Sequence, residues 1–165
     1  MNGKQIYHPP REIRGLPPEL VGYFDGRDLR GRIGEAIGLN TVGEDGWPHA
    51  ALLSVGEILA VDSENLRLVM SPGSTTTRNI ERTGRVTLSL VHGNAFWEIR
   101  LAARREGDAA GVGHNSAIFV ATVELVRIHE VPYARVESGV SYQLNDPDAV
   151  VERWEQQILV LRSGI

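Results

Sequence analysis

The residues best suited to binding chemistry lie in the stretch SPGSTTTRNI at positions 71–80. Four hydroxyl side chains, from Ser74 to Thr77, stand in a row and are followed by Arg78. An apolar run at 66–70 comes directly before them, so the pattern predicts a strand that leads into a helix capped by Ser74. The first N–H groups of a helix lack internal partners and carry a partial positive charge. Together with Arg78, they would bind an anion such as a phosphate group.

The same stretch has a plainer interpretation. Serine and threonine are common helix caps, and a run of threonines can simply be solvated. Taken alone, these residues leave two hypotheses open, a phosphate cradle or a capped helix without a ligand.

Composition excludes several classes of site. With 165 residues, of which 42% are hydrophobic, the chain suits one domain with a core. It has no cysteine, which excludes a disulfide scaffold, a thiolate metal site and a cysteine nucleophile. Its five histidines show no metal-ligand spacing, so we predict no metal. The net charge of −4 gives no reason to expect a nucleic acid or an anionic membrane as a partner.

The start of the chain, MNGKQIYHPPREIRG, is polar and does not resemble a secretory signal. No apolar run approaches the roughly 20 residues that a membrane-spanning helix needs. We therefore expect a soluble, cytoplasmic protein that binds no membrane.

The pattern of apolar residues predicts a mainly β fold. Apolar and polar residues alternate with a period of two most clearly at 85–91 and 96–104. About six strands are expected, at 35–42, 47–56, 66–70, 85–91, 96–104 and 117–128. The first two flank a loop with Asp45-Gly46 and read as a β-hairpin. Such a set of strands suggests a closed antiparallel barrel with peripheral helices.

Three helices and two loops complete this prediction. Short helices are expected at 19–24 and after the third strand. A terminal helix is expected behind Asp146 and Pro147, with the apolar stripe Val151, Trp154, Ile158 and Leu161. The Gly-rich segment 107–116 and the segment 132–145 are expected to be loops. As a single domain overall, the chain divides into an N-terminal arm with a short helix (1–34) and a barrel with the C-terminal helix (35–165).

The three tryptophans are assigned by position. Trp97 and Trp154 are expected to fill the core or a dimer interface. Trp47, at the end of a hairpin, is expected to be more exposed.

Over residues 38–91 the chain resembles the FMN-binding split-barrel family, which includes pyridoxamine 5′-phosphate oxidase and flavin reductase-like proteins. Many members have a hairpin motif T-x-x-x-D-G-x-P-H, which is matched here by Thr41, Asp45, Gly46, Pro48 and His49. A second motif, S-x-K-x-x-N-L before a strand that begins near R-V, is matched in order by Ser74, Asn79, Ile80, Arg85 and Val86.

The resemblance implies a six-stranded antiparallel split β-barrel that forms a homodimer, with FMN at the subunit interface, and acts as an oxidoreductase on a small-molecule substrate. It also implies that the flavin ring lies against the second strand, at Ala51, Leu52, Leu53 and Ser54. The residues that it implies as contacts of the flavin phosphate are Ser71, Ser74, Thr75, Thr76, Thr77 and Arg78. It identifies no catalytic residue.

The sequence departs from the family pattern where the phosphate would bind. The motif lysine is replaced by Thr76, and the second strand, HAALLS, has no arginine or lysine. Candidates to compensate are Arg67 and Arg78, or a basic residue contributed by the other subunit, for which Arg100, Arg104 and Arg105 are candidates. The alternative hypothesis is therefore a barrel that is non-catalytic, or that binds another cofactor such as haem or the deazaflavin F420.

Overall fold

The fold is dominated by one sheet. A computed structural model describes the chain except for residues 1–5, 113 and 165. The described residues form eight strands, namely β1 (Arg11–Ile13), β2 (Ala36–Val42), β3 (Pro48–Ser54), β4 (Ile58–Ala60), β5 (Asn65–Met70), β6 (Arg85–His92), β7 (Ala95–Val112) and β8 (His114–His129). The helices of this part of the chain are α1 (Pro18–Tyr23), α2 (Thr75–Thr83) and α3 (Pro147–Ser163).

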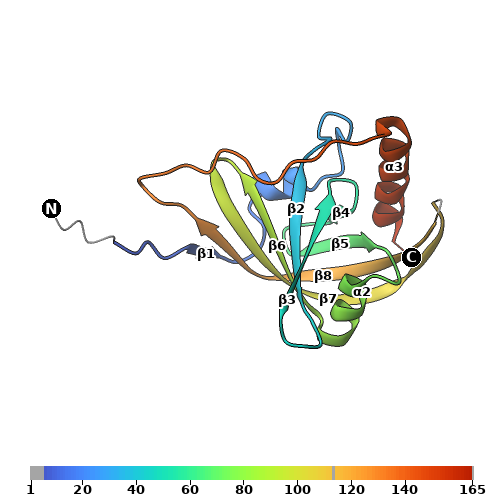
Figure 1. Cartoon of the computed structure of the whole chain (residues 1–165), viewed down its shortest axis with the longest axis horizontal. Coiled ribbons are helices and arrows are strands. Elements are labelled where there is room, and N and C mark those ends of the chain that lie inside the picture. Colours follow the sequence, from blue (N-terminus) through green and yellow to red (C-terminus); the bar gives the residue numbers. More distant parts are fainter. Residues whose placement is uncertain (1–5, 113, 165) are drawn as a thin grey trace.

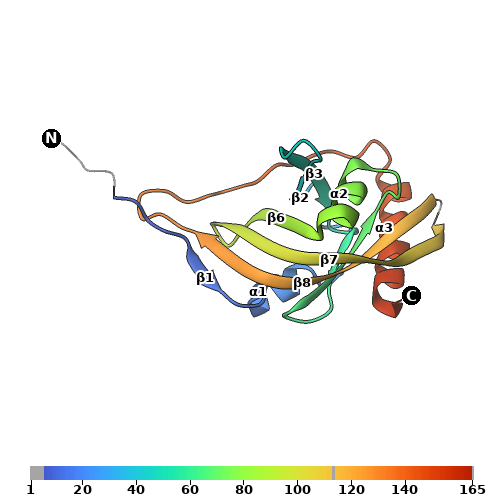
Figure 2. The ribbon, with the colours of Figure 1, turned by 90° about the horizontal axis from the view of Figure 1, so that it is seen from below.

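The strands pair in the order β3-β2-β6-β7-β8-β5-β4, with β1 attached to β8, and all pairs are antiparallel. The sheet curls so strongly that β2 and β3 run across the β7–β8 ribbon in Figure 1. Figure 2 shows β7 and β8 as one long curved ribbon with α3 beside one end of it. This arrangement confirms the prediction of a mainly β split barrel with peripheral helices.

All six predicted strands are present, as β2, β3, β5, β6, β7 and β8. The two further strands, β1 and β4, have three residues each. The first lies in the segment expected to be an arm, and pairs with β8 through Arg11 and Ile128. Three residues are too few to show an alternating pattern, which is why the sequence did not indicate them.

The prediction of a loop at 107–116 is wrong. β7 continues to Val112 and β8 starts at His114, so the two strands pair through most of this segment. Shifts in register after Arg105 and after Ala109 absorb the irregular residues. A β ladder is made by backbone groups, so glycines and small side chains weaken the strand without ending it.

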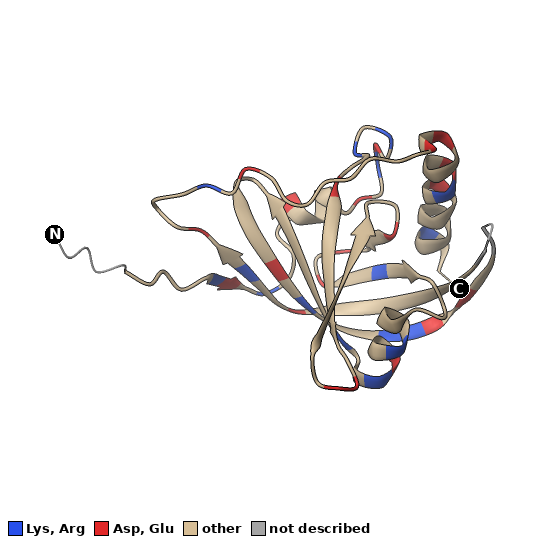
Figure 3. Cartoon of the chain, viewed as in Figure 1, with Lys and Arg blue, Asp and Glu red and all other residues tan. Residues whose placement is uncertain are grey.

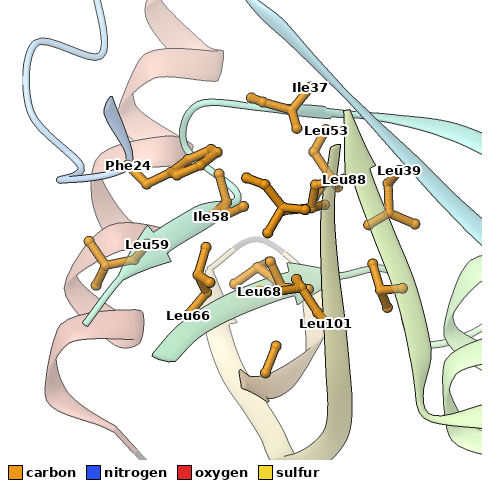
Figure 4. Close-up of a cluster of buried hydrophobic side chains, with 14 of the residues drawn as sticks. Phe24, Ile37, Leu39, Leu53, Ile58, Leu59, Leu66, Leu68, Leu88 and Leu101 are labelled. Carbon is orange, nitrogen blue, oxygen red and sulfur yellow. The ribbon is translucent and has the colours of Figure 1, made fainter. Parts of the chain in front are cut away.

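The inner face of the curled sheet forms the core. Figure 4 shows leucine and isoleucine side chains from several strands meeting Phe24, the residue after α1. On β7, Trp97, Ile99 and Leu101 are at most 3% exposed, whereas Arg100 lies on the outer face. The alternation in the sequence therefore predicted the buried face of β7 correctly.

Helix α3 closes one end of the barrel and contacts β4, β5 and β7. The carboxylate of Asp146 caps its start by accepting the N–H of Ala149 at 3.2 Å. The predicted apolar stripe is buried in full, and includes Trp154. Trp97 is also in the core and Trp47 is 73% exposed, as predicted.

Charged residues of both signs lie along α3 and close to α2 in Figure 3. Within the part of the chain that the structure describes, no helix has both the length and the apolar character needed to cross a membrane.

A glycine in the turn after β3 lets α3 pack closely. Gly56 faces the buried ring of Trp154, and a Cβ atom added at this position would overlap the ring. Any larger residue would force the helix or the turn to move.

We therefore expect Gly56→Ala to lower the free energy of unfolding by about 1–3 kcal/mol, the range for overpacked sites. Gly22→Ala is the matched control, because a Cβ there would meet no atom within 4 Å, and it should leave stability unchanged or slightly higher. Urea denaturation of both variants measures the difference. Equal stabilities would contradict the packing described here.

One carboxylate is largely buried near Arg153 of α3. The Oε2 atom of Glu57 accepts the backbone N–H of Ser54 at 2.6 Å. Burial raises the pKa of Glu57, and the hydrogen bond from Ser54 and the charge of Arg153 offset this only in part. The folded chain thus holds the carboxyl proton more tightly than the unfolded chain does.

The stability contributed by this proton is fully present below the unfolded pKa and is lost as the pH rises through the folded pKa. Glu57→Gln keeps an acceptor for Ser54 but does not titrate. The ordinary pKa of a glutamate is 4.5. As the pH rises from below this value to neutral, the native chain loses the stability that the proton contributes, whereas Glu57→Gln does not. We therefore expect the free energy of unfolding of Glu57→Gln to increase relative to that of the native chain over this pH range. Denaturation at both pH values checks this, and a constant difference between the proteins would refute it.

Candidate functional site

The start of α2 is held in place by its own hydroxyl groups. Ser74 Oγ accepts the N–H of Thr77 at 3.0 Å, and so caps the helix. The Thr77 hydroxyl in turn donates to the carbonyl of Ser71 at 2.7 Å. These three predicted site residues therefore shape the turn between β5 and α2.

Two N–H groups at this helix start are left over. Those of Thr75 and Thr76 have no hydrogen-bond partner among the described residues. The positive end of the helix dipole lies at the same place, so an anion is the kind of ligand that this helix start could hold.

Helix α2 is fixed to the β2–β3 hairpin by a buried polar contact. Asn79 Nδ2 donates to Thr41 Oγ1 at 3.0 Å, and both side chains are 3% exposed. Both residues match motif positions of the family resemblance, although the sequence gave neither a role. The contact sets how the helix start faces the hairpin.

Between α2 and the hairpin lies a cavity of about 430 Å³. Its lining includes Trp47 and His49 from the hairpin side and Thr75 and Arg78 from the helix side. The guanidinium of Arg78 donates to the Gly73 carbonyl at 2.7 Å and to Thr75 Oγ1 at 3.1 Å. It is therefore a positive charge fixed at the helix start.

Of the predicted phosphate residues, only Thr75 and Arg78 line this cavity. Thr76, at the position of the family lysine, is 7% exposed, and Thr77 is fully buried. Their side chains pack inside the fold. The assignment of Ser71, Ser74, Thr76 and Thr77 to a ligand stays a prediction.

The predicted ring-binding segment lies on an edge strand. β3 is at one end of the strand order, so one of its edges pairs with no other strand of the described chain. Leu53 points into the core, Ala51 is half-buried and Leu52 is 55% exposed. The N–H of Ser54 is already bonded to Glu57. Backbone groups of this edge remain the natural contacts for a flat ligand.

Of the arginines considered as substitutes for the missing lysine, Arg78 lines the cavity, whereas Arg67, Arg100, Arg104 and Arg105 do not. Arg105 pairs with Glu81 and with Asp108, and Arg100 Nε lies 3.0 Å from a carboxylate oxygen of Glu98. Arg67 donates to the Leu161 carbonyl at 2.9 Å. Among the residues that the structure describes, Arg78 is the one arginine or lysine in the lining, which also includes the acidic residues Glu44 and Asp45.

A cluster that the sequence did not indicate joins α1 to β2. The Arg32 guanidinium lies 4.3 Å from the centre of the Tyr23 ring and bonds Glu35 Oε2 at 2.9 Å. Burial, followed by the charge of Glu35, raises the pKa of Tyr23 to about 12. The phenol stays protonated at neutral pH. These residues carry no motif, so only the fold brings them together.

Comparisons with known proteins show the family and the fold of the chain. No family model matches it. It is 32% identical over 146 residues to the uncharacterized protein YclD of Bacillus subtilis. The aligned region covers 88% of this chain and 95% of YclD. Among solved structures, it resembles a candidate pyridoxamine 5′-phosphate oxidase from Lactobacillus delbrueckii, with a TM-score of 0.54. The two sequences are 18% identical, and the superposed region covers 72% of this chain and 98% of the other. The chain therefore belongs to the same family as YclD, and its fold is the split barrel of the pyridoxamine 5′-phosphate oxidase-like proteins.

Proposed function

We propose that the chain binds FMN between α2 and the β2–β3 hairpin and acts as an oxidoreductase related to pyridoxamine 5′-phosphate oxidase. One observation carries the proposal. The two free N–H groups of Thr75 and Thr76 and the guanidinium of Arg78 lie together at the start of α2, beside a cavity of about 430 Å³. Such a place suits a phosphate group.

The residues present fit the rest of the cofactor as well. The cavity lies within the range of roughly 300–1,000 Å³ found for small-molecule sites. The free edge of β3 offers backbone donors and acceptors to a heteroaromatic ring, and the exposed side chain of Trp47 is part of the cavity lining.

In this account the chain binds and orients, while FMN supplies the hydride or electron transfer when bound. Arg78 and the start of α2 hold the phosphate. Ser74 and Thr77 keep the helix start in position, and the edge of β3 orients the ring. The substrate is a small molecule, and the sequence favours a cytoplasmic location.

The cofactor site is shared, in our proposal, between two copies of the chain. Leu52 and Trp47 are 55% and 73% exposed, and Val42 is 39% exposed on the neighbouring strand. These apolar side chains all belong to the β2–β3 hairpin, where a second copy would bury them.

A second candidate function is a non-catalytic barrel, or one that binds haem or the deazaflavin F420. The burial of Thr76 and the lack of a basic residue on β3 favour it, because a doubly charged phosphate would meet a single arginine and two acidic residues, Glu44 and Asp45, in the cavity lining. A Soret band in the absorbance spectrum would distinguish haem from a flavin.

We expect Arg78→Gln to weaken FMN binding about tenfold or more, since a hydrogen bond to a charged group contributes about 1.5–3 kcal/mol. Quenching of flavin fluorescence during titration measures the dissociation constant. Arg135→Gln is the control, because Arg135 is also exposed and does not line the cavity. Equal weakening by both variants, or by neither, would remove Arg78 from the site.

For the shared site, we expect Leu52→Glu to convert a dimer to a monomer and to lose FMN affinity with it. Leu159→Glu is the matched control, because Leu159 is 56% exposed on α3 and should keep the dimer. Light scattering after size-exclusion chromatography gives the mass. A native chain that is monomeric, or a dimeric Leu52→Glu, would contradict the shared site.

A further inference from the structure

A second groove crosses the outer face of the sheet at the other end of α2. Its volume is about 790 Å³, and Thr83 and Gly84, where α2 ends, form one side of it. The cavity of the proposed cofactor site lies at the start of the same helix. At 1.5 Å per residue, the nine residues of α2 separate the two places by about 13 Å.

The register of the sheet gathers three arginines around this groove. Arg67 on β5 and Arg104 on β7 both pair with Val120 of the intervening strand β8. Two residues along β7, and so on the same face, Ala102 pairs with Arg85 of β6. The three arginines thus share one face of the sheet with the small side chains of Ala102 and Val120, and all five residues line the groove.

Two of these arginines have unused donors. Neither the Arg85 nor the Arg104 side chain has a hydrogen-bond or ion-pair partner among the residues that the structure describes, and both are exposed. Arg67 differs, because the carbonyl of Leu161 at the end of α3 holds it at 2.9 Å. Arginine presents a planar fork of donors that fits carboxylate and phosphate oxygens.

The groove also contains an acceptor without a donor. Oε2 of Glu106 is buried and receives no hydrogen bond within the described chain. The nearest cation, Arg67 Nε, is 3.9 Å away, which is beyond hydrogen-bond distance. A buried carboxylate oxygen left in this state is costly unless a ligand donates to it.

From these features we infer that the groove is a binding site for a small metabolite that carries both an oxyanion and a hydrogen-bond donor. The oxyanion, a phosphate or a carboxylate, binds Arg85 and Arg104. An ammonium or hydroxyl group of the same molecule donates to Glu106. The volume suits a ligand of this kind. The acidic Glu106 and Glu124 in the lining, and the net charge of −4, disfavour a nucleic acid.

Calorimetric titration with glucosamine 6-phosphate, inorganic phosphate and glucosamine tests the inference at low ionic strength, because salt screens exposed charges. The first compound carries both groups, and the other two carry one each. We expect glucosamine 6-phosphate to bind most tightly. Arg104→Gln should weaken it about tenfold, and so should Arg85→Gln, as expected for a lost charge-assisted contact. Glu106→Gln should reduce the ratio by which glucosamine 6-phosphate binds more tightly than inorganic phosphate.

Two controls separate this groove from other anion sites. Arg135→Gln, which removes an exposed charge outside the groove, should leave the titrations unchanged. The phosphate position proposed at the start of α2 would also take up the two phosphate compounds, so Arg78→Gln is titrated beside Arg104→Gln. Arg78→Gln should keep the tighter binding of glucosamine 6-phosphate relative to inorganic phosphate, because that difference depends on Glu106 in the groove. Absence of binding by all three compounds would overturn the inference, as would binding that is lost in Arg78→Gln but kept in Arg104→Gln.

Discussion

The buried hydrogen bond between Asn79 and Thr41 is the contact on which the candidate site depends. It joins α2 to the β2–β3 hairpin beside the cavity, together with an exposed hydrogen bond from Arg82 to the carbonyl of Val42. Breaking one partner would leave a buried polar group unpaired, at a cost of about 1–3 kcal/mol. With this contact in place, Thr75 and Arg78 at the helix start line the cavity beside the hairpin.

Much of this frame can be predicted from the sequence. Period-two alternation at 96–104 identified the buried face of β7, and the apolar stripe around Trp154 identified the buried face of α3. Ser74 was recognised as a cap because short hydroxyl side chains stabilise helix starts. These features are local, so a short window of sequence contains the whole signal.

The features that the sequence did not predict depend on contacts between residues that are far apart in the chain. The extension of β7 and β8 through a Gly-rich segment is decided by backbone hydrogen bonds, which the side chains do not encode. The Tyr23–Arg32–Glu35 cluster, the burial of Thr76 and the three-arginine groove all require knowledge of register or tertiary packing. In the structure the side chains of Ser74 and Thr77 build the helix start, and the binding of a ligand by this stretch stays a prediction.

The most direct test of the central claim is the visible absorbance spectrum of the purified chain after incubation with excess FMN and removal of free dye. Our account predicts a retained flavin band in stoichiometric amount, with one phosphate bound per helix start. A colourless protein would contradict it, and the turn from Ser71 to Arg78 would then be a capped helix start with no part in cofactor binding.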